Sequence, residues 1–260
     1  MSEPRFAFLD HPGPIPFAHR GGAREAPENT WRSFEHAHSL GYRYMETDVH
    51  ATSDGVVVAF HDDDLARMAA RSELLRDLSW QSVSSVRLDG DQAIPRLDEL
   101  MSAWPEVRWN IDAKDDSVVG PLADTISRCG SLERVCVTSF SDRRLARVRR
   151  TLGPALCTAM GPGAVATLRA ASVMPAQIGG PMTVLLRRFG AAQVPTHQGR
   201  LPLVDERFVS RAHTIGLQVH VWTVNDGEDM NRLLDVGVDG IMTDRPAVLK
   251  EVLARRGSWT

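Results

Sequence analysis

Short apolar runs recur along the chain, and several of them end in polar or charged residues. We interpret nine of these runs as strands, because each has the length and the apolar character of a buried strand. They are residues 15–18, 42–45, 56–60, 107–111, 135–138, 155–159, 192–194, 217–222 and 240–242. Segments with helical spacing lie between them, among others at residues 31–40, 142–151, 205–215 and 228–236. The alternation of strands and helices favours a parallel sheet with right-handed crossovers.

The first predicted helix carries capping signals at both ends. Asn29 or Thr30 is the expected N-cap, and Gly41 is the expected C-cap. About eight strand–helix units in 260 residues are typical of a TIM barrel. The pattern by itself also allows an open, doubly wound sheet. In a barrel, polar residues that follow the strands gather at their carboxyl ends, where active sites are built.

Two segments depart from this pattern. Residues 62–98 carry mixed charges, Trp80 and no clear strand–helix unit. We expect them to form a small insertion after the second strand region, inside a single domain that spans residues 1–260. Residues 161–190 contain the turn signals GPG and IGGP, so we expect either a long loop over the site or an ordinary helix with frayed ends.

Four groups of polar residues stand at the ends of predicted strands. They are His19 with Arg20, Glu46 with Asp48, His61 with Asp62, and Asp112 with Lys114. Because alternate residues of a strand face the same side, Glu46 and Asp48 can approach one cation together. The same spacing lets Asp112 reach the metal while Lys114 reaches an anion beside it.

These residue types suit a site that binds a divalent cation and a phosphate. Hard cations such as Mg²⁺ and Ca²⁺ prefer oxygen ligands. Arg20 offers a planar fork for phosphate oxygens, and Lys114 offers a compact charge. Histidine side chains such as those of His19 and His61 titrate near neutrality, as general acid–base catalysis requires. The set predicts metal-assisted phosphodiester hydrolysis.

An ordered series of motifs resembles one known family. FAHRGG, followed by APENTWRSFEHAHSLGYRYMETDVHATSDGVVVAFHDDDL, resembles the N-terminal signature of glycerophosphodiester phosphodiesterases. IPRLDEL, WNIDAK, VCVTSF, VHVWTVN and VGVDGIMTDRP then follow in that family's order. The resemblance runs from residue 17 to residue 246, which is nearly the whole chain. It implies a TIM barrel, with the insertion forming one wall of the pocket.

The resemblance also implies what each candidate residue does. The matched positions are His19 and His61 for acid–base catalysis, Arg20 and Lys114 for the phosphate, Trp222 for an aromatic wall of the pocket, and Glu46, Asp48 and Asp112 for the metal. Many family members have a glutamate where Asp112 stands. The family also often has threonines where this chain has Met68 and Ala69, near the substrate entrance. The difference at Asp112 shortens the third predicted metal ligand by one methylene. The difference at Met68 and Ala69 implies that the leaving group differs from that of other family members.

The expected reaction converts a small glycerophosphodiester into sn-glycerol 3-phosphate and an alcohol. One divalent cation, Mg²⁺ or Ca²⁺ with Mn²⁺ as a further candidate, would act as Lewis acid and template. The resemblance suggests attack by the glycerol 2-hydroxyl through a cyclic phosphate, and direct attack by water would use the same groups. The sequence leaves open which histidine is the base, as well as the alcohol and the oligomeric state.

Two alternative functions remain open at this stage. A lysophospholipase D or sphingomyelinase D-like activity would need an apolar rim, which Met68, Leu74, Leu75 and Trp80 would supply unless they form the core of the insertion. A non-catalytic phosphate- or metal-binding barrel is disfavoured, because both histidines and all three carboxylates are present.

Several polar residues have simpler interpretations. Lys114 could be an ordinary surface lysine, and Trp222 could be plain core. We expect Glu28 to stand at a helix N-terminus and Asp244 to order the last strand-to-helix turn. We expect structural positions for four further histidines, His50, His197, His213 and His220.

Composition narrows the class of protein. The net charge of −3 gives no support to nucleic-acid binding. The first residues lack the apolar stretch of a signal peptide, and no run approaches the 18 apolar residues of a membrane span. Three cysteines without metal-like spacing favour reduced thiols. We therefore expect a cytoplasmic protein.

Overall fold

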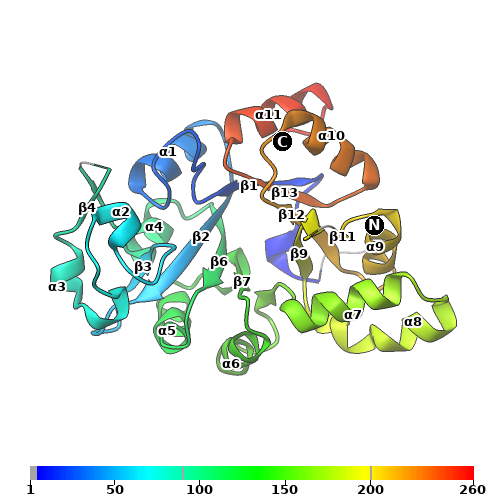
Figure 1. Cartoon of the computed structure of the whole chain (residues 1–260), viewed down its shortest axis with the longest axis horizontal. Helices are drawn as coiled ribbons and strands as arrows, with labels where there is room; N and C mark the ends of the chain where they lie inside the picture. Colours follow the sequence, from blue (N-terminus) through cyan, green and yellow to red (C-terminus); the bar gives the residue numbers. More distant parts are fainter. Residues whose placement is uncertain (1–4, 90, 200) are drawn as a thin grey trace.

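Eight parallel strands close into a barrel in the computed structural model, which describes residues 5–89, 91–199 and 201–260 (Figure 1). They are β1 (Ile15–His19), β2 (Tyr44–Ala51), β6 (Arg108–Ala113), β7 (Val135–Thr138), β8 (Cys157–Thr158), β9 (Ala191–Pro195), β12 (Gln218–Trp222) and β13 (Gly240–Thr243). The strands are ordered β8-β7-β6-β2-β1-β13-β12-β9, and a parallel bridge between Ala159 and Ala191 joins the two ends. The TIM-barrel prediction is confirmed, and the doubly wound sheet is excluded.

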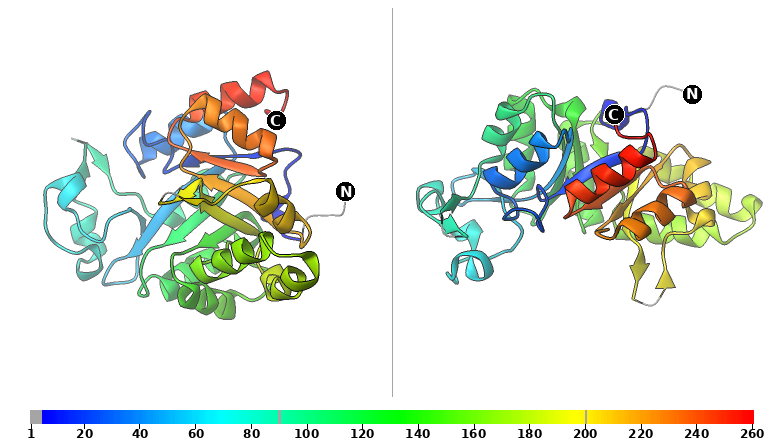
Figure 2. Two further views of the ribbon diagram at one scale, coloured as in Figure 1. Left: turned by 45° about the vertical axis from the view of Figure 1, so that its right-hand side comes forward. Right: turned by 90° about the horizontal axis from the view of Figure 1, so that it is seen from above.

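Helices cover the outside of the barrel, as the two views in Figure 2 show. They are α1 (Trp31–Ser39), α4 (Leu97–Ala103), α5 (Val119–Arg128), α6 (Asp142–Leu152), α7 (Pro162–Ser172), α8 (Ala176–Met182), α9 (Glu206–His213), α10 (Gly227–Val236) and α11 (Pro246–Arg255), with 3-10 turns η1 (Ala7–Leu9), η3 (Leu132–Arg134) and η4 (Val184–Arg188). Thr30 caps α1, because its side chain accepts a hydrogen bond from the Ser33 N–H. The predicted N-cap Thr30 is confirmed; the C-cap is Leu40, one residue before the predicted Gly41, and Gly41 follows it with φ +97°.

The strand register arranges the barrel interior in layers. Phe17 of β1 lies beside Tyr44 of β2, and both are buried at one end of the barrel, where Phe8 of η1 packs against them. Two residues further along each strand, His19 lies beside Glu46. Residues two positions apart point to the same side of a strand, so both pairs face the barrel interior. The aromatic pair lies at the closed end of the barrel, and the ionisable pair lies toward the carboxyl ends of the strands.

Two of the predicted strands are longer than expected. Glu46 and Asp48 lie inside β2, not beyond its end, because β2 stays paired with β6 as far as Val49 and Ala113. Asp112 likewise lies inside β6. The apolar run ends early in the sequence because these acids face the cavity, while pairing continues through the backbone.

The predicted strand at residues 56–60 is not a barrel strand. It forms β3 (Val57–Ala59), which turns back and pairs antiparallel with β2. The insertion follows it and contains α2 (Ala66–Ala69), η2 (Leu75–Asp77), α3 (Trp80–Val83), β4 (Arg87–Leu88) and β5 (Gln92–Ala93). It ends earlier than residue 98, because α4 begins at Leu97 and packs on the main core.

The insertion has its own hydrophobic core. Leu75 is buried in it, and Met68 and Trp80 pack against it. None of these three side chains lines the large cavity described below. Of the two interpretations of these residues, the structure supports the one in which they stabilise the insertion.

Residues 161–190, left open between loop and helix, are mainly helical. They form α7, α8 and η4 before β9 begins. Gly179 permits α8 to approach α7, since a Cβ there would lie 2.5 Å from the carbonyl oxygen of Ala171. After β9, β10 (His197–Gln198) and β11 (Leu201–Pro202) form a short hairpin.

Candidate active site

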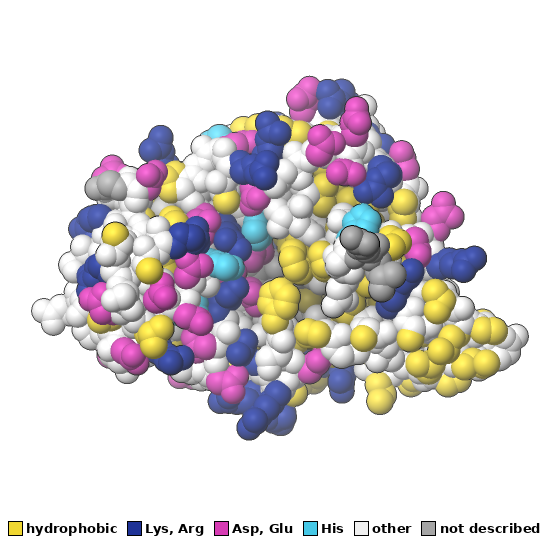
Figure 3. All heavy atoms as spheres, viewed as in Figure 1, with side chains coloured by type: hydrophobic (Ala, Val, Ile, Leu, Met, Phe, Trp, Pro, Cys, Tyr) yellow, Lys and Arg dark blue, Asp and Glu magenta, His cyan; other side chains and the backbone are white. Residues whose placement is uncertain are grey.

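A cavity of about 740 Å³ opens at the carboxyl ends of the barrel strands. Figure 3 shows the hollow near the centre of the molecule, with ionisable side chains on one side and hydrophobic side chains on the other. The polar half is lined by His19, Arg20, Glu46, Asp48, His61, Asp112 and Lys114, and the apolar half includes Phe140, Met160, Val165, Val194, Leu203 and Trp222. The structure therefore brings all eight predicted site residues to one cavity.

His19, the last residue of β1, is held by a carboxylate from the other end of the sequence. Its Nδ1 lies 2.6 Å from Asp244 Oδ1, and Asp244 Oδ2 accepts a hydrogen bond from Asn225 Nδ2 at 2.9 Å. Its Nε2 lies 3.7 Å from Glu46 Oε2. Burial lowers the pKa of His19, but Glu46 and Asp244 outweigh burial, so the net pKa is raised.

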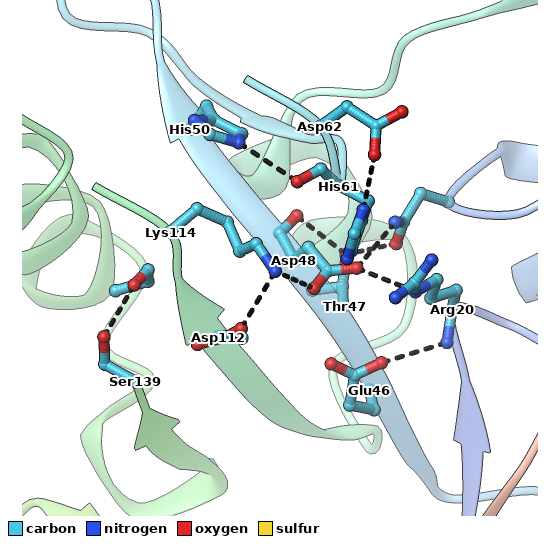
Figure 4. Close-up of polar contacts among 12 residues, drawn as sticks. Arg20, Glu46, Thr47, Asp48, His50, His61, Asp62, Asp112, Lys114 and Ser139 are labelled. Atoms are coloured by element: carbon cyan, nitrogen blue, oxygen red, sulfur yellow. Dashed lines mark hydrogen bonds and ion pairs between the residues drawn. The ribbon is translucent and has the colours of Figure 1, made fainter. Parts of the chain in front are cut away.

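His61 follows β3 and has a similar support. Its Nδ1 lies 2.6 Å from Asp62 Oδ1, and Asp62 Oδ2 accepts a hydrogen bond from Arg67 Nε at 2.6 Å. The His61 carbonyl oxygen also lies 3.3 Å from Nε2 of buried His50, as Figure 4 shows. Both candidate catalytic histidines thus have Nδ1 against a carboxylate, which favours a proton on Nδ1 and directs the chemistry to Nε2.

Three carboxylates form the buried floor of the polar half. Glu46, Asp48 and Asp112 are 5%, 3% and 6% exposed. Glu46 accepts a hydrogen bond from the Arg20 backbone N–H at 3.1 Å. Asp48 accepts hydrogen bonds from Asn29 Nδ2 at 3.1 Å and from Lys114 Nζ at 3.2 Å.

Two cations pair with this floor. Arg20 Nε lies 3.0 Å from Asp48 Oδ2, in an ion pair whose angle does not make a hydrogen bond. Lys114 Nζ lies between Asp48 and Asp112, 3.2 Å from an oxygen of each (Figure 4). Lys114 is therefore not the ordinary surface lysine of the simpler interpretation.

The floor carries more negative than positive charge, and its pKa values reflect this. Burial and the nearby Asp48 raise the pKa of Glu46 to about 7. Burial also raises the pKa of Asp112. Burial would raise the pKa of Asp48 as well, but Arg20 and Lys114 lower it below its ordinary value. Three buried carboxylates beside two cationic side chains leave an excess of negative charge, which favours the binding of a cation.

The donor set fits a hard divalent cation. Oδ1 of Asp112 is buried and has no hydrogen-bond partner among the described residues, so it is available as a ligand. Within residues 5–89, 91–199 and 201–260, no three His, Cys, Asp or Glu side chains are already gathered as a metal cluster. Lys114 stands between two of the three predicted ligands, Asp48 and Asp112. Glu46, Asp48 and Asp112 remain the predicted ligands.

Four supporting residues were not predicted. Asp244 supports His19, Asp62 supports His61, and Asn29 links Asp48 to Thr47, whose hydroxyl donates to the Asn29 side chain at 2.8 Å. Asn225 fixes Asp244. Asp62 was visible beside His61 in the sequence, whereas Asp244 is 225 residues from His19. The pairing of Ala18 with Thr243 brings Asp244 and His19 together.

Two simpler interpretations need correction. Glu28 does not cap the helix, since Thr30 does; Glu28 accepts hydrogen bonds from Arg20 at 3.2 Å and Arg67 at 2.6 Å. Asp244 does more than order a turn. Arg20 itself has φ +52°, a conformation that costs a non-glycine residue about 1–3 kcal/mol and is concentrated at functional sites. This conformation places its N–H on Glu46.

Trp222 forms part of the apolar half of the cavity. Its ring meets Phe140 edge to face, with centroids 5.8 Å apart, and packs against the cluster that contains Phe17. Phe140 is 67% exposed, so this pair borders the mouth of the cavity. The two interpretations of Trp222, pocket wall and core, both describe part of its environment.

Comparison with known proteins identifies related chains. The family model described as "Glycerophosphoryl diester phosphodiesterase family" matches residues 19–248. A probable glycerophosphodiester phosphodiesterase 2 of Mycobacterium tuberculosis is 39% identical over 257 residues, covering 98% of this chain and 97% of that protein.

Solved structures share the fold. The crystal structure of a putative glycerophosphoryl diester phosphodiesterase from Silicibacter pomeroyi has a TM-score of 0.77 and 25% identity, covering 98% of this chain and all of that one. A phosphodiesterase from Oleispira antarctica, solved in complex with the product sn-glycerol-3-phosphate, has a TM-score of 0.77, 21% identity, and coverage of 93% and 97%. At 21% identity, the similarity to the Oleispira antarctica protein shows a shared fold.

Proposed function

Because the chain belongs to the glycerophosphoryl diester phosphodiesterase family and is a phosphoric diester hydrolase, we propose that it hydrolyses small glycerophosphodiesters to sn-glycerol 3-phosphate and an alcohol with the help of a divalent cation. The observation that carries this proposal is the convergence of two carboxylate-supported histidines on one floor of acids and cations. Such a set offers acid, base and charge stabilisation within one cavity.

The phosphate of the substrate would bind between Arg20 and Lys114. Both cations border the cavity, and both are held in place by Asp48. Positive charge held before the reaction begins stabilises the negative charge that develops on the phosphoryl oxygens. Arg20 is oriented further by Glu28, so little side-chain freedom would be lost on binding.

The two histidines would divide the proton transfers. One accepts the proton of the attacking hydroxyl at Nε2, and the other donates a proton from Nε2 to the leaving oxygen. Asp244 and Asp62 hold the rings with Nδ1 turned away from the cavity. Attack by the glycerol 2-hydroxyl and attack by water both use this arrangement.

The cation would be held by Glu46, Asp48 and Asp112, whose oxygen donors suit Mg²⁺ or Ca²⁺, with Mn²⁺ as a further candidate. When bound, such an ion supplies Lewis-acid polarisation of a phosphoryl oxygen. The shorter side chain of Asp112 bears on which of these ions fits best.

The test is the release of sn-glycerol 3-phosphate from glycerophosphocholine and glycerophosphoethanolamine, measured with EDTA, Mg²⁺, Mn²⁺ or Ca²⁺. We expect metal-dependent release that falls by about 10²–10⁴-fold in His19→Ala and His61→Ala. Folded wild-type protein that releases no product with any cation would refute the proposal. If release is equal with and without EDTA, the proposed requirement for a divalent cation would be refuted.

A lysolipid substrate is the second candidate, because half of the cavity is apolar. Phe140, Met160, Val165 and Trp222 offer a surface on which an alkyl chain could lie. This wall is not the one expected from the sequence, since Met68, Leu75 and Trp80 belong to the core of the insertion. Comparing turnover of glycerophosphocholine with that of lysophosphatidylcholine separates the two substrates.

We also propose that the protein is located in the cytoplasm.

A further inference from the structure

The exposed large hydrophobic side chains of the described chain are concentrated on one surface. Apart from Phe140 at the cavity mouth, all of them lie on or between α7, α8 and η4: Val173, Met174, Ile178, Met182, Val184 and Leu185. We call this set the α7–η4 surface. Ile178 and Leu185 are 59% and 73% exposed. Figure 3 shows hydrophobic side chains gathered over α7 and α8, at the lower right of the view.

The α7–η4 surface lies in a segment with an unusual charge. Residues 143–204 contain nine arginines and no Asp, Glu or Lys. The whole chain has a net charge of −3, so the rest of the chain has a net charge of −12. Arg187 and Arg188 directly follow Leu185 and Leu186 and are exposed. Arg211 of α9 donates a hydrogen bond to the carbonyl oxygen of Met174, which adds a third positive charge beside the surface.

The α7–η4 surface is continuous with the mouth of the cavity. Val165, Ala170 and Val173 of α7 and its C-cap line the cavity, and Val173 also belongs to the surface. Figure 3 shows the hollow and the hydrophobic patch on the same face. A partner seated on the surface would therefore border the cavity entrance.

We propose that the α7–η4 surface docks on an anionic lipid surface. Exposed apolar side chains enter the boundary between headgroups and acyl chains, and nearby arginines pair with lipid phosphates, which is how peripheral proteins bind such membranes. Among the described residues, no helix has both the length and the apolar character needed to cross a membrane. A second copy of the chain fits less well, since two such surfaces would bring like charges together.

This docking does not depend on the proposed reaction. The test is co-sedimentation of the full chain with vesicles of phosphatidylcholine alone or with 30–40% phosphatidylglycerol, a composition of about one anionic lipid in three. We expect binding to the anionic vesicles that weakens several-fold between low and high salt, because surface charges are screened. No binding to anionic vesicles would overturn the proposal.

Two double variants locate the contact. Ile178→Asp with Leu185→Asp, and separately Arg187→Gln with Arg188→Gln, should each lower vesicle binding by tenfold or more. The matched control, Arg232→Gln with Arg255→Gln, removes two exposed arginines from α10 and α11 and should bind as the wild type does. Equal loss of binding in the control, or none in the surface variants, would overturn the proposal.

Two further measurements keep the result clear. Thermal unfolding checks that each variant is folded, and hydrolysis of soluble glycerophosphocholine should be unchanged in all of them, because none of these residues lines the cavity. Failure of hydrolysis in the wild type would count against the proposed reaction and leave vesicle binding to be judged alone. If the wild type does not bind vesicles but forms a dimer in sedimentation velocity, and the double variant Ile178→Asp with Leu185→Asp does not form it, the surface would be assigned to self-association and the proposal would be overturned.

Discussion

Replacing Asp244 by Asn tests whether the carboxylate behind His19 orients the imidazole. The substitution keeps the shape of the side chain and removes its charge. Asn225 Nδ2 donates to Asp244 Oδ2, so the amide of the variant would keep its oxygen on that side. Its NH₂ group would then face His19 Nδ1, which now lies 2.6 Å from a carboxylate oxygen. The imidazole would carry its proton on Nε2, the nitrogen that the proposed reaction uses.

This change impairs His19 in either catalytic position. A base would already be protonated at Nε2, and an acid would lose the carboxylate that stabilises its doubly protonated ring. We expect kcat to fall by about 10²–10⁴-fold, the usual contribution of a general acid or base. That is about 2.7–5.4 kcal/mol of transition-state stabilisation at 1.36 kcal/mol for each factor of ten.

The fold should tolerate the substitution. A hydrogen bond to a charged group contributes about 1.5–3 kcal/mol, and 1 kcal/mol shifts the melting temperature of a protein of this size by about 2–4 °C. Asp244→Asn should therefore melt several degrees below the wild type and remain folded at 25 °C.

The assay is steady-state hydrolysis of glycerophosphocholine under saturating metal. Asp62→Asn makes the equivalent change behind His61, and Asp235→Asn, an exposed side chain paired with Arg256, is the matched control. A folded Asp244→Asn protein with more than a tenth of wild-type kcat would refute the orienting function of Asp244.

Three other predictions concern the phosphate site and the barrel interior. Lys114→Gln should lower kcat/KM by about 10²–10³-fold, the effect of removing one preorganised charge-stabilising donor, and steady-state kinetics would show it; a change below threefold would contradict a contact with phosphate. Gly240→Ala should destabilise the fold by about 1–3 kcal/mol in urea titrations, because its Cβ would lie 2.8 Å from His220 Cδ2, whereas Gly120→Ala in α5, which meets nothing within 4 Å, should be neutral or stabilising. Burial lowers the pKa of His220 to about 4, below its ordinary value of 6.5, so the unfolded chain binds the proton first as the pH falls. Stability should then drop by up to about 3 kcal/mol between pH 6.5 and 4, and equal pH slopes in the wild type and His220→Gln would contradict this.

Local patterns in the sequence determined much of this protein. Apolar runs predicted the barrel strands, although the run at residues 56–60 proved to lie outside the barrel. Thr30 and Gly41 marked the ends of α1, and the motifs around His19 and His61 identified the family. These features can be predicted from the sequence because they depend on the spacing of residues along the chain, which has a period of two in strands and of about 3.6 in helices. The spacing of the acids in β2 and β6 made them candidate site residues for the same reason.

Tertiary structure decided what depends on distant parts of the chain. Barrel closure brings Asp244 to His19, and the backward turn of β3 brings His61 over the barrel mouth. The apolar side chains of the insertion are buried in a core of their own. Those of the α7–η4 surface are also apolar, but they remain exposed. Hydrophobicity in a sequence states only that a side chain favours burial; whether another element covers it is settled by packing.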